Sequence, residues 1–128
     1  MALQLKRGPK ECVWTKARIT HRDDNGKTYA DEFEVQIRTP SDVDDLLRES
    51  DMVRGEGETD PAAARQRVTQ YLRDNIRDWR KLIGADDQEI PFSGDALDEL
   101  IQIAPYRVGL VELVMETRKA PAGAERKN

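Results

Sequence analysis

The length, composition and charge of the chain favour a single folded domain and exclude several classes of protein. Its 128 residues are 38% apolar and 36% charged, which suffices for one compact core. The formal charge of −4 disfavours nucleic-acid binding, because a negative field repels phosphate backbones. No apolar run approaches the roughly 20 residues of a membrane span, and residues 1–10 lack the apolar segment of a secretion signal, so they predict a flexible leader. The single Cys12 cannot form an internal disulfide, which favours a reducing cytoplasm.

The segment 11–38 predicts an N-terminal β-hairpin. Its two halves carry apolar side chains at alternate positions, the period of a strand with one buried face. Between them, Asn25-Gly26 supplies two residues that tolerate positive φ, as a tight hairpin turn requires. The apolar positions of the second half are Phe33, Val35 and Ile37.

Four helices are predicted after the hairpin, and their ranges are about 42–49, 61–83, 94–103 and 105–118. The expected N-caps of the first three helices are Ser41, Asp60 and Ser93. In the first helix, the side chains expected in the core are Val43, Leu46 and Leu47. A hairpin or small antiparallel sheet packed with three to four helices makes an α+β fold, which we expect as one domain over residues 11–118. The remaining residues 119–128 predict a disordered tail.

The helix predicted at 61–83 carries an apolar stripe and a basic stripe on opposite sides. Asn75 falls within the apolar stripe, where a buried amide must find hydrogen-bond partners. The apolar stripe consists of Val68, Tyr71, Leu72, Ile76, Trp79, Leu82 and Ile83. We expect three aromatic anchors of the core: Trp79, Phe92 and Phe33. The basic stripe consists of Arg73, Arg77, Arg80 and Lys81. It is either a docking surface for an acidic protein or a phosphate backbone, or a solvated face.

The sequence offers little material for a catalytic or metal site. His21 has no second histidine beside it, so neither a zinc site nor a nucleophile triad is expected. The spacing around Gly26 partly resembles a calcium loop, but His21 occupies the first ligand position and strands flank the loop. The acid pairs Asp44-Asp45 and Asp86-Asp87 are expected in solvent, where their pKa values stay ordinary. We therefore expect no catalytic residue, no metal, no cofactor and no small-molecule substrate.

The last predicted helix is apolar around more of its circumference than a surface helix needs. Its apolar residues are Val108, Leu110, Val111, Leu113, Val114 and Met115. They span an arc of roughly 220° at helical spacing, about twice the usual width. Either this helix lies at the centre of the domain, or another chain covers part of it. The excess of apolar surface predicts an interaction protein.

The order of segments over residues 30–118 resembles the tail assembly chaperones of long-tailed bacteriophages and prophages. An extended segment leads into a short acidic helix, and a Trp-containing segment, an acidic turn and a Pro-Phe-Ser helix start follow. The residues that carry this resemblance are 33–38, 42–47, 79–93 and 96–100. The stretch from Trp79 to Pro91-Phe92-Ser93 is its most specific part.

The resemblance implies a non-enzymatic protein of the bacterial host cytoplasm. Such chaperones coat the helical tape measure protein, help to recruit tail tube subunits, and are absent from the finished virion. A homo-oligomer is compatible with this role. The alternatives are a structural tail or head–tail joining protein that stays in the virion, and an enzyme with an unrecognised carboxylate site.

Overall fold

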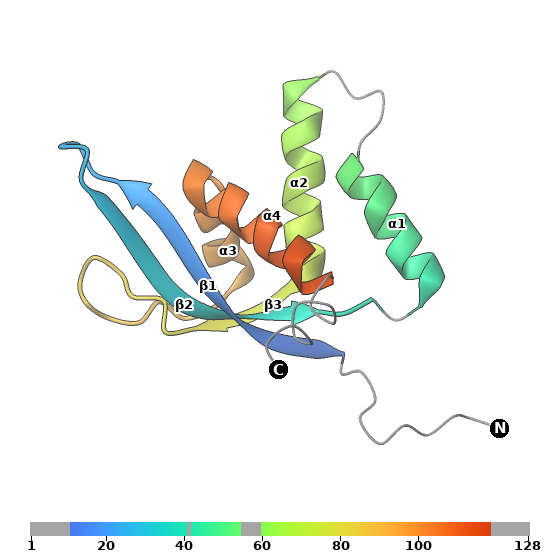
Figure 1. Ribbon diagram of the computed structural model, residues 1–128, viewed down its shortest axis with the longest axis horizontal. Helices are drawn as coiled ribbons and strands as arrows, with labels where there is room; N and C mark the ends of the chain where they lie inside the picture. The colour runs from blue at the N-terminus through green and yellow to red at the C-terminus, as the bar shows by residue number, and fades with distance from the viewer. Residues whose placement is uncertain (1–10, 41, 55–59, 119–128) are drawn as a thin grey trace, which may run out of the picture.

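The computed structural model describes residues 11–40, 42–54 and 60–118, and these residues have an α+β fold (Figure 1). The strands are β1 (Cys12–Arg22), β2 (Thr28–Arg38) and β3 (Ile76–Arg80), and they form an antiparallel sheet in the order β1-β2-β3. The helices are α1 (Val43–Arg54), α2 (Pro61–Asn75), α3 (Gly94–Ile101) and α4 (Ala104–Arg118). In Figure 1, α2, α3 and α4 lie on one side of the sheet, and α1 stands beside α2.

The N-terminal hairpin is confirmed. Pairing between β1 and β2 runs without interruption from Cys12 opposite Arg38 to Arg22 opposite Thr28. At the turn, the Asp23 carboxylate accepts hydrogen bonds from the backbone N–H groups of Asn25 and Lys27, both at 2.9 Å. These bonds lower the pKa of Asp23, the bond from Lys27 most strongly. The loop that partly resembles a calcium site is therefore held by the usual side-chain bonds of a turn.

The core lies between the inward face of the sheet and the helices. Strands β1 and β2 contribute the fully buried Ala17, Ile19, Phe33, Val35 and Ile37. The helices contribute Tyr71, Leu72, Leu97, Ile101, Tyr106, Leu110, Leu113 and Val114. Helix α4 crosses β1 closely at Gly109, where an added Cβ would lie 2.3 Å from the Cδ1 atom of Ile19. A glycine at this point lets the helix backbone approach the strand.

The prediction of one helix over residues 61–83 is wrong. Helix α2 ends at Asn75, and the next residue, Ile76, is extended with φ −92° and ψ 118°. The chain then pairs with β2 as β3, with Trp79 opposite Val35. Within β3, Ile76 and Trp79 are buried whereas Arg77 and Arg80 are exposed, and the pairing with β2 shifts register between Gln36 and Ile37. Residues 76–80 therefore form a strand at the edge of the hairpin, although their apolar residues are spaced as in a helix.

The predicted inward face of the first helix is also wrong. Val43, Leu46 and Leu47 of α1 are 70%, 44% and 58% exposed. The buried side chains are instead Asp45 and Glu49, at 9% and 7% exposure. The acid pair Asp44-Asp45 is thus split between solvent and interior, contrary to expectation. The helix also continues to Arg54, past the predicted end at residue 49.

The remaining helices begin close to their predicted positions. The Asp60 carboxylate accepts from the N–H of Ala62 at 3.1 Å, and the Ser93 hydroxyl accepts from the N–H of Ala96 at 3.0 Å. Both residues are therefore confirmed as N-caps. Helix α3 ends at Ile101, two residues before the predicted end, and α4 begins one residue earlier than predicted. The leader at 1–10, the Ser41 cap and the tail at 119–128 lie outside the described residues.

Candidate protein-binding site

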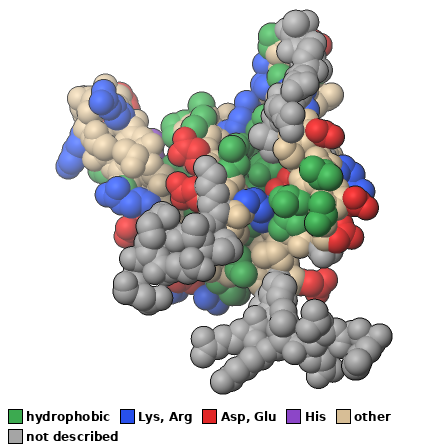
Figure 2. Space-filling view, turned by 45° about the vertical axis from the view of Figure 1, so that its right-hand side comes forward, with side chains coloured by type: hydrophobic (Ala, Val, Ile, Leu, Met, Phe, Trp, Pro, Cys, Tyr) green, Lys and Arg blue, Asp and Glu red, His purple; other side chains and the backbone are tan. Residues whose placement is uncertain are grey.

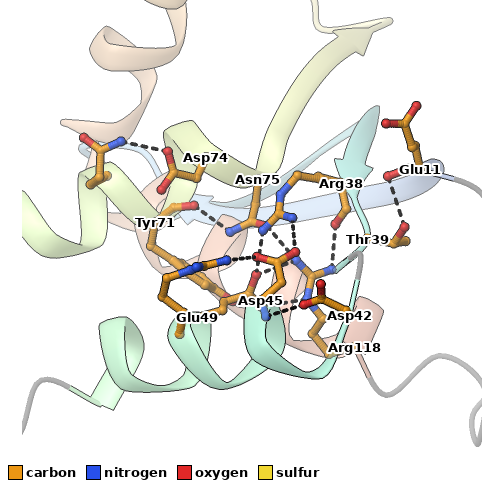
Figure 3. Close-up of polar contacts among 12 residues, drawn as sticks. Glu11, Arg38, Thr39, Asp42, Asp45, Glu49, Tyr71, Asp74, Asn75 and Arg118 are labelled. Atoms are coloured by element: carbon orange, nitrogen blue, oxygen red, sulfur yellow. Dashed lines mark hydrogen bonds and ion pairs between the residues drawn. The ribbon is translucent and has the colours of Figure 1, made fainter.

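A network of charged side chains attaches α1 to the rest of the domain (Figure 3). The Arg38 Nη1 atom lies 2.6 Å from Asp45 Oδ2, and its Nη2 atom lies 3.3 Å from Glu49 Oε2. Arg118, at the end of α4, makes two further bonds to Glu49, from Nε at 2.7 Å and from Nη2 at 2.9 Å. The side chain of Glu49 is 7% exposed and that of Arg118 is 13% exposed. The face of α1 that meets the domain is therefore acidic, and it meets two guanidinium groups.

Arg118 joins four elements at one point. Besides Glu49 on α1, its guanidinium donates to the backbone oxygen of Arg38 on β2 at 2.7 Å and to the Oδ1 atom of Asn75 on α2 at 2.6 Å. Asn75 in turn donates from Nδ2 to the backbone oxygen of Tyr71 at 2.8 Å. The amide that the sequence placed in an apolar stripe thus has both of its polar atoms satisfied in the interior.

The carboxylates of the network favour the charged form of Arg38. Partial burial disfavours the charged form of Arg38, but the hydrogen bond that Arg38 donates to Asp45 and the nearby charges of Asp45 and Glu49 outweigh this effect and raise the pKa of Arg38. Burial raises the pKa of the neighbouring Tyr71 to about 12, and the charge of Glu49 acts in the same direction. Removing one partner from such a pair leaves an uncompensated buried charge, which costs about 3–5 kcal/mol.

The inward acidic face turns the apolar face of α1 toward solvent. Val43, Leu46 and Leu47 recur at positions that share one side of a helix, and all three are exposed. In Figure 2, where the right-hand side of Figure 1 comes forward, apolar side chains gather over the α1 region of the surface. The exposed acids Asp44 and Asp51 border this stripe on the helix. We call Val43, Leu46 and Leu47 the α1 stripe.

The six apolar residues predicted for the last helix divide into two groups. Leu110, Leu113 and Val114 are buried in the core. Val108 and Met115 are 56% and 40% exposed, and Val111 is half-buried against the core. Helix α4 is therefore largely a core helix, with a smaller apolar surface left uncovered.

The predicted basic stripe does not form one surface, because α2 ends before its last three members. Arg73 on α2 pairs with Asp98 of α3. Arg80 pairs with Glu34 and lies 4.0 Å above the ring of Trp14. Lys81 also reaches Glu34, at 3.3 Å, whereas Arg77 is exposed on β3.

The three predicted aromatic anchors do lie in or against the core. The Trp79 indole is buried and donates from Nε1 to the backbone oxygen of Ile90 at 2.8 Å. The Phe92 ring meets it edge-on, with ring centroids 4.9 Å apart. Phe33 is buried on β2 beside Tyr106. These contacts pin the Ile90-Pro91-Phe92 segment to β3, although the sequence placed Trp79 on a helix.

A groove of about 930 Å³ runs along α2 beside α3 and the start of α4. Arg65, Arg73 and Arg107 line it together with Asp98. The hydrogen bond from Arg73 lowers the pKa of Asp98, and Arg80 likewise lowers the pKa of Glu34. A general acid working near neutral pH needs a raised pKa, so these two groups are unsuited to that role.

His21 lies at the end of β1, with its Nε2 atom 2.9 Å from Asp31 Oδ2. Tyr106 also donates to Asp31, and burial together with this bond raises the pKa of Tyr106.

Within the described ranges, no group of three or more His, Cys, Asp and Glu side chains is placed to hold a metal ion. None of the helices formed by these residues is long and apolar enough to cross a membrane.

Sequence reasoning did not identify the network of Arg38, Asp45, Glu49 and Arg118. One signal was present, because Asp45 and Glu49 are four residues apart and share one side of the short helix. The apolar residues on the other side gave a stronger signal for the core.

Comparisons of the chain with protein-family models, with curated proteins and with solved structures found no match.

Proposed function

We propose that the chain is a non-enzymatic tail assembly chaperone that uses the α1 stripe to hold a helical segment of a tape measure protein. The observation that carries the proposal is the orientation of α1, which buries Asp45 and Glu49 and exposes Val43, Leu46 and Leu47. Apolar groups on a helix surface gain free energy when a partner removes them from water. The buried ion pairs hold this surface in place before the partner arrives, which reduces the ordering cost of binding.

The surroundings of the stripe indicate the chemistry of the partner. Asp44 and Asp51 border the α1 stripe, so a partner helix with an apolar face and flanking lysines or arginines complements it. Helical partners of this kind dock through apolar residues spaced three and four apart. The resemblance of residues 30–118 to tail assembly chaperones supplies the identity of the partner and the further role in recruiting tail tube subunits. Val108 and Met115 of α4 provide additional exposed apolar surface.

The proposal is tested with the double variant Leu46→Lys, Leu47→Lys. Circular dichroism should show an unchanged fold, because both side chains are exposed. Calorimetry with a tape measure fragment should show binding weakened by at least about tenfold, equivalent to about 1.4 kcal/mol. The control Ile83→Lys changes another exposed apolar residue, outside α1, and should bind normally. Equal binding by all three proteins would contradict the proposal.

The fate of the protein after assembly separates a chaperone from a structural component. A chaperone should be missing from purified virions in quantitative mass spectrometry, whereas a tail or head–tail joining protein should be present at a fixed copy number. Sedimentation equilibrium of the purified chain tests self-association through the same stripe. A dimer that the Lys double variant abolishes would assign the α1 stripe to a second copy of the chain instead of the tape measure protein.

A further inference from the structure

The outer edge of β1 and one face of α4 enclose a second groove, remote in sequence from the α1 stripe. Its volume is about 200 Å³. The strand wall consists of Lys16, Ala17, Arg18 and Ile19, and the helix wall consists of Gly109, Glu112, Leu113 and Glu116. Four consecutive strand residues include both inward and outward side chains. The groove therefore follows the edge of the strand as well as its buried face.

The edge of β1 offers backbone hydrogen-bonding groups. Strand β1 is the first in the sheet order β1-β2-β3, so β2 occupies one of its edges and no other described strand occupies the second. The eleven pairs with β2 contain no bulge, which leaves a regular second edge. Such an edge is a template for another strand, and addition of a peptide strand is a known mode of protein recognition.

The charges on the outward face of β1 select the occupant. Lys16 and Arg18 point away from the core, since Ala17 and Ile19 are buried. Two β1 edges paired with each other would bring basic side chains together, which disfavours a second copy of the chain. Glu34, opposite Lys16 on β2, is already bound by Arg80 and Lys81. A carboxylate on an incoming strand therefore has a place beside Lys16.

The helix wall of the groove is acidic, so it favours basic side chains on the face of an incoming strand that meets α4. Glu112 and Glu116 are exposed on α4, and no described residue forms an ion pair with either of them. Side chains on the inner face of an incoming strand would point toward this wall, while those on its outer face would lie beside Lys16 and Arg18. The complementary strand therefore alternates, with basic residues facing α4 and acidic residues facing outward.

We propose that the β1–α4 groove accepts an extended segment of a partner protein with alternating basic and acidic side chains, which adds to the sheet as a strand next to β1. This site does not depend on the function proposed for the α1 stripe. The backbone of β1 supplies the hydrogen bonds, and Lys16, Glu112 and Glu116 supply the charge pattern. Together, the contact beside Lys16 and the two contacts to the α4 carboxylates should make about a tenfold difference in affinity, equivalent to about 1.4 kcal/mol.

The test compares two fluorescent peptides of identical composition, one with alternating Lys and Glu and one with all Lys followed by all Glu. The full-length chain should bind the alternating peptide at least about tenfold more tightly in fluorescence anisotropy. Hydrogen exchange followed by NMR should slow at amides of Lys16–Ile19 when this peptide is present. Equal affinities, or binding without slower exchange in β1, would overturn the proposal.

Charge-reversal variants locate the binding site. Glu112→Lys with Glu116→Lys should lose the preference for the alternating peptide, because the helix wall then repels its basic side chains. The matched control is Asp95→Lys with Glu99→Lys, which has the same spacing on α3, and it should retain the preference. Leu46→Lys with Leu47→Lys should also retain it, since α1 is not part of this groove. A loss in either of these controls, or β1 amides protected by dimerisation without peptide, would refute the assignment.

Discussion

Helices α1 and α3 are short amphipathic helices that bury opposite kinds of side chain. Helix α3 covers the core with Leu97 and Ile101, whereas α1 turns Asp45 and Glu49 inward and leaves its apolar residues in solvent. The surfaces that receive them differ. Helix α3 meets an apolar cluster, whereas α1 meets the guanidinium groups of Arg38 and Arg118. The chemistry of the receiving surface therefore decides which side of an amphipathic helix is buried.

The largest effect expected from breaking this contrast follows from Glu49→Ala. The change leaves Arg118 and Arg38 with buried positive charge and one carboxylate fewer, so the free energy of unfolding should fall by about 3–5 kcal/mol. Urea denaturation followed by circular dichroism measures it. Asp44→Ala removes an exposed acid from the same helix and should change stability by no more than about 0.5 kcal/mol. Similar losses in both variants would show that the position of Glu49 in the network is unimportant.

Truncating one apolar residue on each helix tests whether the apolar residues of α3 stabilise the domain and those of α1 do not. Ile101→Ala on α3 should cost about 2–5 kcal/mol, because Ile101 is fully buried and truncation leaves a cavity. Leu47→Ala on α1 should change stability by about 0.5 kcal/mol or less, as expected for an exposed residue. Both values come from the same denaturant series. A large loss for Leu47→Ala would mean that the domain itself covers the α1 stripe.

The smallest effect concerns pH and the ion pair that links α3 to α2. The hydrogen bond from Arg73 lowers the pKa of Asp98 below its ordinary 3.8. A lowered pKa stabilises the fold above the unfolded-state pKa, and this contribution disappears as pH falls through the folded-state pKa. Asp98→Asn should therefore be slightly less stable than the parent at pH 6, and the two should converge in acid. A difference that persists below pH 3 would assign the loss to something other than charge. Both side chains are substantially exposed, so screening by salt should also reduce the difference.

Several features of the fold were predictable because short segments determine them. The Asn25-Gly26 turn and the alternation on both sides specified the hairpin, and its pairing is confirmed. Asp60 and Ser93 act as caps through bonds to the next turn of their own helices. Trp79 was recognised as an anchor on a helix, yet it is buried on a strand. A large aromatic side chain is a strong signal of burial in either element.

Two features of the candidate sites depended on contacts between distant residues. Glu49 and Arg118 are 69 positions apart in sequence, and β3 follows α2 directly but pairs with β2, about 40 positions away. Neither association leaves a periodic pattern in one segment. The same holds for the β1–α4 groove, because its two walls come from opposite ends of the described chain.

The sequence by itself determined the α+β class, the hairpin with its turn, the helix caps at Asp60 and Ser93, and the amphipathic character of the helices. These features depend on backbone preferences and on hydrogen bonds within a few residues. Only the tertiary structure decided which face of α1 is buried, where α2 gives way to β3, and which apolar residues of α4 remain exposed. Each of these outcomes depends on the neighbour that a surface meets, since burial favours an acidic side chain only where a buried cation compensates its lost hydration.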